Sequence, residues 1–440
     1  NVAVGGYALA NDTTGGNSAV GYKALTTNTT GDYVTAMGYN ALELNTTGSS
    51  NSAFGYKSLE DNTTASNNTA VGYIALNTNT TGAENTAVGA NALTSNSTGE
   101  ENVAIGYKAL EANTTASGNT AVGRKSMLTN TTGASNSAFG VDSLYDNTTG
   151  DYNTAVGRAA LANNTTADAN TAVGYYALLT STTASNNTAV GASSAALTTT
   201  GAQNTALGAR ALYTNTTTNN NTAVGYDALY TNTASNNTAV GRDSSKANTT
   251  GTLLVSVGAW SLAANTTGIR NTAIGYESMS ANTTGSHNTA VGTYALATPT
   301  TANDNTAVGY YACKATTTGV NNVGVGNSAL GANTTGSDNV AVGQIALATS
   351  TTAEGNVAIG RYSMNNTTTG SNNVAIGKNS LDANTTGSGS VAIGYEALTA
   401  ATTGGQNVAV GYRALKSSTT NQDNVAVGYE ALEANTSGKN

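Results

Sequence analysis

The sequence predicts an all-β fold, a parallel β-solenoid or β-roll of 26 coils with a 17-residue period. Three observations predict it. One short motif recurs along all 440 residues, in 24 units of 17 residues and two of 16. Charged residues make up only 9% of the chain, whereas globular domains carry about 25%. A fixed period of about 20 residues or more is the usual sign of a repeat architecture, and 17 residues are too few for a helix pair.

The unit has the consensus N-T-A-V-G-Y-x-A-L-x-x-N-T-T-G-x-x, in which the first Asn is position 1. Position 4 is apolar and position 5 is Gly in every unit. We expect N-T-A-V and Y-x-A-L to form short β segments, and N-T-T-G to form a bend. Glycine at position 5 allows a backbone conformation or a close approach that a side chain would obstruct. The structural-turn residues that we single out are Gly55, Gly72, Gly89 and Gly106.

A lone coil cannot fold. It buries about two large apolar side chains, which we place at positions 4 and 9, and these supply roughly 5 kcal/mol. Ordering seventeen residues costs about 25 kcal/mol. Stacking on neighbouring coils must therefore supply much of the difference. We expect the Asn columns at positions 1 and 12 to form amide ladders along the axis.

The repeats leave no residue for a linker, so residues 1–440 are predicted to form a single continuous array without caps. Repeat arrays normally need capping repeats for solubility. We therefore expect either a longer natural chain or coils that join end to end into filaments.

The first strand carries no charged residue at positions 1 to 5 in any unit. Alternate strand residues face opposite sides, so positions 2 and 4 share one face and position 3 lies on the other. We infer that both faces are buried, one inside the coil and one against another copy of the chain. The alternative is a neutral Thr and Ser face in water.

The composition argues against several classes of protein. One Cys excludes a disulfide framework, and one His with one Cys is too few for an ordinary zinc site. The net charge of −8 gives no basic footprint for nucleic acid, and no apolar stretch is long enough for a membrane span. No column repeats an acid, base or nucleophile beyond Thr, so we expect neither an enzyme nor a bound cofactor or metal.

A few side chains could carry a function, and each has a plainer alternative. His287 is expected in a solvated turn, and Cys313 is expected to be a buried thiol in a Leu position. Trp260 could contact a sugar but fits a scattered surface residue better. The Tyr residues at position 6 predict a stacked ladder, with a binding stripe as the alternative. A regular Thr array could bind ice, but the Thr column at position 2 gives way to Val from Asn322 onward.

The N-T-T turn also matches the N-x-[ST] acceptor for N-glycosylation. The alternative is that Asn and Thr simply build the turn and its ladder. The candidate glycosylation sites are Asn28, Asn45, Asn62, Asn79, Asn113, Asn130, Asn147, Asn164, Asn215, Asn248, Asn265, Asn282, Asn333 and Asn384.

The pentapeptides Asn102–Gly106, Asn356–Gly360 and Ser390–Gly394 resemble the head repeats of trimeric autotransporter adhesins, the YadA-like head family. Similar repeats occur in phage-type tail fibres. The resemblance implies a left-handed parallel β-roll, three chains packed about one axis, and a surface-exposed binding or spacer role. The unit here is longer than the family's, by an added N-T-T-G turn.

These observations together predict a structural fibre or adhesin shaft, located outside the cell, on its surface or in a virion fibre. Its main partner is expected to be itself, as a lateral homo-oligomer, by the resemblance a trimer. The alternative is an adhesin head or tail-fibre module that binds a glycan or a host surface.

Overall fold

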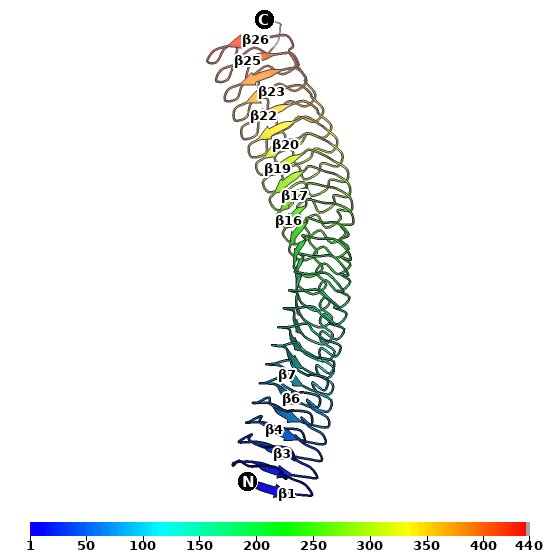
Figure 1. The fold of residues 1–440 in the computed structure, drawn as a ribbon. Helices are drawn as coiled ribbons and strands as arrows, with labels where there is room; N and C mark the ends of the chain where they lie inside the picture. Colours follow the sequence, from blue (N-terminus) through cyan, green and yellow to red (C-terminus); the bar gives the residue numbers. More distant parts are fainter. Residues whose placement is uncertain (437–440) are drawn as a thin grey trace. The chain divides into compact units, whose positions relative to one another are not determined.

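The computed structural model describes residues 1–436, and its elements are all short β-strands (Figure 1). Contacts within the chain divide it into two units, Asn1–Asn220 and Asn221–Asn440. Each unit holds thirteen strands of three residues, one in every coil. The described part contains no helix, and the predicted all-β parallel solenoid is confirmed.

The strands of the first unit are β1 (Val2–Val4), β2 (Ser18–Val20), β3 (Thr35–Met37), β4 (Ser52–Phe54), β5 (Thr69–Val71), β6 (Thr86–Val88), β7 (Val103–Ile105), β8 (Thr120–Val122), β9 (Ser137–Phe139), β10 (Thr154–Val156), β11 (Thr171–Val173), β12 (Thr188–Val190) and β13 (Thr205–Leu207).

The strands of the second unit are β14 (Thr222–Val224), β15 (Thr238–Val240), β16 (Val255–Val257), β17 (Thr272–Ile274), β18 (Thr289–Val291), β19 (Thr306–Val308), β20 (Val323–Val325), β21 (Val340–Val342), β22 (Val357–Ile359), β23 (Val374–Ile376), β24 (Val391–Ile393), β25 (Val408–Val410) and β26 (Val425–Val427).

Within each unit, strands pair in parallel with their neighbours in sequence. The register joins residues one period apart, as in Thr154 with Thr171 and Ala155 with Ala172. Every strand position therefore stacks on the same position of the next coil. The period seen in the sequence becomes a set of columns that run along each unit.

The second predicted β segment, Y-x-A-L, is not a strand, and that prediction was wrong. Positions 7 and 9 adopt the left-handed region instead, as in Lys57 (φ 54°) and Leu59 (φ 54°). Ordinary side chains adopt this region at a cost. Neighbouring coils stabilise it here, because the amide of Leu59 donates to the carbonyl of Ala75 at 3.0 Å.

The core of each coil is made by the side chains at positions 3, 8 and 9. Ala104, Ala109 and Leu110 are completely buried, whereas Ile105 at position 4 is 39% exposed. The prediction that position 4 fills the core was therefore wrong. Ala at position 3 faces inward because Leu at position 9 already fills the narrow interior, which leaves space only for a methyl group.

Glycine at position 5 is required by both backbone angle and space. Gly72 has φ +141°, and a Cβ there would lie 2.5 Å from the carbonyl oxygen of Gly89. Gly55, Gly89 and Gly106 share this conformation, with φ between +135° and +141°. A side chain would strain the backbone and collide with the next coil.

The asparagines at positions 1 and 12 tie each coil together and join it to the next. The backbone N–H of Asn85 donates to the side-chain Oδ1 of Asn68, one period earlier, at 2.9 Å. Within the coil, the Nδ2 atoms of Asn85 and Asn96 both donate to the carbonyl of Gly99, at 2.8 and 2.9 Å. These bonds fasten the N-T-T-G turn to the start of the strand.

Two of the three departures from Leu or Met at position 9 pack against a departure at position 3, whereas the third, Ala195, is followed by the usual Ala206. Position 9 of one coil lies against position 3 of the next. Ser245 replaces Leu at position 9, and its Oγ lies 2.7 Å from the Oγ of Ser256, which replaces Ala. Cys313 replaces Leu beside Gly324, where a Cβ would collide with the Cys313 sulfur. A change of size or polarity at one position is thus compensated at the other.

Candidate functional site

The candidate site is the outer face, which we define as the side chains at positions 2 and 4 of the strands. Exposure alternates from one residue to the next along each strand. Around β7, Glu101 is exposed, Asn102 buried, Val103 half-buried, Ala104 buried and Ile105 exposed. Positions 2 and 4 therefore point away from the core and form two parallel columns on the sheet.

Apolar side chains line the outer face in every coil. Position 4 carries only Val, Ile, Leu, Met or Phe, and position 2 carries only Thr, Ser or Val. Within the stacks, the position 4 side chains stay partly open, as in Phe54 (37%) and Ile376 (36%). Contiguous apolar surface of this kind marks interaction sites on soluble proteins.

The outer face changes character along the chain. In β1–β13, position 2 is mostly Thr or Ser, and only Val2 and Val103 are apolar there. In β20–β26, position 2 is Val in all seven strands. The C-terminal strands thus present two apolar columns where the N-terminal strands present one apolar and one hydroxyl-bearing column.

The Tyr residues at position 6 form stacked rows beside the outer face. The ring centroids of Tyr39 and Tyr56 lie 5.4 Å apart at 14°, and those of Tyr56 and Tyr73 lie 5.3 Å apart at 10°. Such offset stacks are favourable for aromatic pairs. Because the rings cover one another's faces, the ladder that the sequence predicts leaves few faces open for a sugar.

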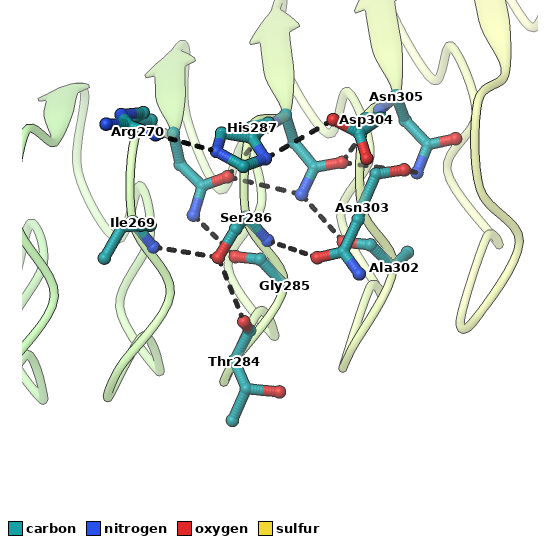
Figure 2. A network of polar contacts seen from close by, with 12 residues as sticks. Ile269, Arg270, Thr284, Gly285, Ser286, His287, Ala302, Asn303, Asp304 and Asn305 are labelled. Carbon is teal, nitrogen blue, oxygen red and sulfur yellow. Dashed lines mark hydrogen bonds and ion pairs between the residues drawn. The ribbon is translucent and has the colours of Figure 1, made fainter.

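The other border of the outer face, at positions 16 and 17, is held by a polar network (Figure 2). The Ile269 N–H donates to Ser286 Oγ at 3.1 Å, and the Ser286 N–H donates to Asn303 Oδ1 at 2.7 Å. The side chains of Ser286 and Asn303 thus each cap the backbone of the preceding coil.

His287 lies in this border, exposed as predicted. Its Nε2 is 3.4 Å from Arg270 Nη1, and its Nδ1 is 3.4 Å from Asp304 Oδ1 (Figure 2). All three residues occupy position 17 of consecutive coils. The structure therefore places the histidine in a surface row of charged side chains.

All fourteen candidate glycosylation residues are buried asparagines of the position 12 column. In each, Nδ2 donates to the backbone carbonyl three residues later, at 2.8–3.1 Å. An N-linked glycan would be attached to that same nitrogen, where the fold leaves no space. The geometry favours the alternative, in which Asn builds the turn and the ladder.

The two remaining single residues are held within the fold. Cys313 is completely buried, and burial raises the pKa of its thiol to about 12. Trp260 is half-buried and packs edge-on against Tyr276, while the Arg242 guanidinium lies 5.2 Å from its ring centroid. The indole of Trp260 is therefore partly covered by Tyr276 and Arg242.

The first unit also has an open groove of about 390 Å³ next to the position 6 and 7 columns. It is lined by Arg124, Lys125, Asp142, Tyr145, Asp146, Ala162 and Asn163. Arg124 lies 3.6 Å from Asp142 across it. Charged groups of both signs and a phenol are the kind of groups that bind a small polar ligand.

Among residues 1–436, no helix has the length and apolar character needed to cross a bilayer. The same residues contain no group of three or more His, Cys, Asp or Glu side chains placed to hold a metal ion.

No protein-family model matches this chain, and a search of curated proteins finds no relative. The regular parallel solenoid fits the folds of repeat-based fibres and adhesins. The YadA-like resemblance, with its left-handed winding and three chains, stays a prediction from the repeated pentapeptides.

Sequence reasoning placed positions 2 and 4 on one face but missed that this face points outward. The missed signal was the charge distribution at the neighbouring exposed positions 17 and 6. Charges occur in both of these columns and never between them. A strand whose outward side adjoins charged columns on both sides, yet stays free of charge itself, indicates a protected outer surface.

Proposed function

We propose that this protein is a structural shaft, part of an extracellular, cell-surface or virion fibre, whose chains associate side by side through the outer face. The observation that carries the proposal is the outer face itself, which is free of charge in all 26 coils and has an apolar, partly exposed side chain at position 4 in each of them. No enzymatic activity is part of the proposal.

The magnitude of the apolar surface supports association. Full burial of a Val or Ile side chain is worth about 1.5–3 kcal/mol. About half of the position 4 side chains within the stacks keep somewhat over a third of their surface open, as Val71 does at 37%, and the others keep less. Covering this open surface would supply roughly 0.5–1 kcal/mol for each, so thirteen coils supply roughly 10 kcal/mol. The cost of bringing two chains together is about 4–15 kcal/mol.

The repeated fold suits a shaft because each coil depends on its neighbours. Backbone bonds, asparagine ladders and tyrosine stacks all run between adjacent coils. Such arrays lengthen by adding units, without changing the fold of any one unit. The number of chains we propose is three, which rests on the resemblance to the YadA-like heads.

Carbene labelling tests the proposal. The full chain is labelled with a photoactivated diazirine, and modification of Ile376 and Phe54 is compared with that of Thr64, which lies in an exposed turn. Wild-type protein should protect Ile376 and Phe54 several-fold relative to a Val374→Lys variant, whose association is weakened, while Thr64 is labelled equally in both. Equal labelling of the outer face in both proteins would contradict the shaft.

A second candidate function rests on the groove around Tyr145, which would bind a glycan or another small polar ligand of a host surface. Binding of the full chain to an array of immobilised glycans would support it, provided that Tyr145→Ala abolishes binding and Tyr73→Ala leaves it unchanged. Loss of binding in both variants, or no binding by wild type, would remove this candidate.

A further inference from the structure

Two exposed columns of opposite charge flank the outer face. Position 17 lies just before the strand and position 6 just after it. We call the charged acids at position 17 the acidic edge: Glu84, Glu101, Asp304, Asp338 and Asp423. We call the cations at position 6 the basic edge: Arg124, Arg158, Arg242, Arg361 and Lys378. All ten are exposed.

The separation of signs is nearly complete. Position 6 carries no acid in any coil, and Arg270 is the one cation at position 17. Position 16 adds five more carboxylates beside the acidic edge: Asp32, Glu100, Asp151, Asp168 and Glu354. Each of the two units carries both edges by itself.

The basic edge is only partly neutralised by its own chain. Arg124 lies 3.6 Å from Asp142, and Arg242 Nε lies 3.1 Å from Asp243 Oδ2. Yet their side chains remain 53% and 62% exposed. Position 6 carries five cations and no carboxylate, so it stays positive, whereas the position 7 lysines Lys23, Lys57 and Lys108 are paired with acids at position 10.

The symmetry of two copies decides which edges meet. When two chains run parallel and turn their outer faces toward each other, the acidic edge of one lies beside the basic edge of the other. When they run antiparallel, like edges meet, and like charges side by side disfavour a complex. A parallel ring of three or more copies also brings unlike edges together, because its contacts are heterologous.

The spacing of the charges agrees with parallel chains in register. Coils rise about 4.8 Å each, and charges interact within a Debye length of about 8 Å at physiological salt. In that arrangement four of the five basic-edge residues have an acid at position 16 or 17 within one coil. Arg124 is close to Glu101 and Arg361 is close to Glu354, while Arg242 has no such acid.

We propose that the outer face receives a second copy of the same chain in parallel orientation, with the acidic edge of one copy against the basic edge of the other. This inference rests on the proposed function, because it requires side-by-side association. It adds the orientation of the copies and the residues that select it.

Energy transfer between labelled chains tests the orientation. Thr64 and Thr166 are exposed turn residues, six coils apart, or roughly 30 Å. Cys313 is buried, so Thr64→Cys or Thr166→Cys provides the one reactive thiol. Donor-labelled and acceptor-labelled chains of the same variant are then mixed. The dye pair is chosen so that its Förster radius is well below that separation. In-register parallel chains then predict efficient transfer for both variants, whereas antiparallel chains keep the labels of at least one variant about 30 Å or more apart along the axis, and this result would overturn the inference.

A charge exchange tests the edges. Arg124→Glu with Arg361→Glu should weaken association by about tenfold or more at low salt. Adding Glu101→Arg and Glu354→Arg should restore it, because each edge then has reversed sign and unlike edges still meet. Thr132→Glu with Thr369→Glu, in exposed turns, is the matched control and should leave association unchanged.

The outcomes separate the two proposals. Association without parallel transfer, or without rescue by the reciprocal exchange, overturns the orientation and leaves the shaft standing. A wild-type chain that stays monomeric at every concentration overturns both. Parallel transfer together with rescue supports both.

Discussion

Two runs of coils show that the same fold is held in different ways. In residues 17–169, position 12 is Asn in nine consecutive coils, and position 2 is Thr or Ser except for Val103. In residues 322–423, position 12 is Asn only at Asn333 and Asn384, and position 2 is Val throughout. The first run has a continuous polar ladder inside, and the second has a doubly apolar face outside.

The ladder inside the first run is a chain of buried amide bonds. Asn62 Nδ2 donates to Asn45 Oδ1 at 2.7 Å, Asn96 Nδ2 to Asn79 Oδ1 at 2.8 Å, and so on to Asn164. In the second run the Oδ1 atoms of Asn333 and Asn384 are buried and accept no hydrogen bond, as in the first run only the ladder's last residue, Asn164, does. An unsatisfied buried polar group costs about 1–3 kcal/mol.

The strand pairing and the column of large apolar side chains at position 9 continue through both runs, and the position 1 asparagines do so except at Val34 and Ser390. The position 12 ladder is therefore an added source of stability, and the fold tolerates its interruption. We infer that the second run compensates for the broken ladder by burying more apolar surface between chains.

The largest difference between the runs should follow a charge placed on the outer face. Val374→Lys in the second run should reduce association by about a hundredfold or more, because a buried unpaired charge is costly. Thr120→Lys in the first run should reduce it by about tenfold. Sedimentation measures association, and circular dichroism should show both variants folded, since both side chains point outward.

Thr369→Lys, in an exposed turn, provides the control and should change neither property. Unfolding of Val374→Lys would show that position 2 faces the core, contrary to the exposure pattern.

The next largest effect concerns the amide ladder. Asn96→Ala should cost about 2–3 kcal/mol, because it strands Asn79 Oδ1 and removes an acceptor from Asn113 Nδ2. Asn333→Ala should cost about 1 kcal/mol or less, since the Gly336 carbonyl keeps its bond from Asn322. Amide hydrogen exchange in the flanking coils measures both. Equal costs would show that the ladder is not cooperative.

Repairing the ladder should stabilise the second run. Ser350→Asn places an amide beside the unsatisfied Asn333 Oδ1 and should add about 1 kcal/mol. Denaturant unfolding of the full chain measures it, with Ser350→Ala as the matched control, expected to be near neutral because the Ser350 hydroxyl is also unsatisfied. Destabilisation by Ser350→Asn would mean that the column has no space for a full amide.

An effect confined to alkaline pH is predicted for Cys313, just before the second run. Burial raises the pKa of the Cys313 thiol to about 12. Above the ordinary value of about 8.5, the unfolded chain ionises this thiol and the folded chain does not. Stability should therefore be unaffected below that pH and fall between there and about 12, by at most about 1.4 kcal/mol per pH unit.

Cys313→Leu should remove this part of the slope, as seen in urea unfolding at several pH values. The folded wild type should also resist alkylation at pH 8. Rapid alkylation would show that the thiol is accessible.

The smallest expected effect is on mass. Because every candidate glycosylation amide is buried and hydrogen-bonded, peptides that cover these asparagines, taken from chains purified from their natural source, should have unmodified masses. Peptide mass spectrometry measures this. Added hexose or hexosamine mass that maps to Asn62 or Asn130 would contradict the ladder at those coils.

The coil, its parallel register and its glycine and asparagine columns could be predicted, because a fixed period determines which residues stack. Which face of the strand points into the core could not be predicted from alternation alone. Alternation puts positions 2 and 4 together, but the size of Val suggested a core that Ala104 and its equivalents fill instead. The space left for the strand side chains depends on how much of the interior Leu110 fills, and this is seen only in the folded coil.

The turn at positions 7 and 9 could not be predicted either. Lys57 and Leu59 carry no local sign of left-handed backbone, and hydrogen bonds to adjacent coils stabilise it. The paired departures Ser245 with Ser256 and Cys313 with Gly324 were visible as irregularities, but their contact is seen only after the coils are stacked.

If the outer face lies between copies of this chain, the full chain associates in solution. Static light scattering of the full chain under native conditions measures this over a range of concentrations. One chain has a mass of 43.6 kDa. We expect a mass of two or more chains, with three matching the resemblance, and for Val374→Lys at the same concentration a mass nearer to one chain. A wild type that scatters as one chain at every concentration would contradict the proposed association.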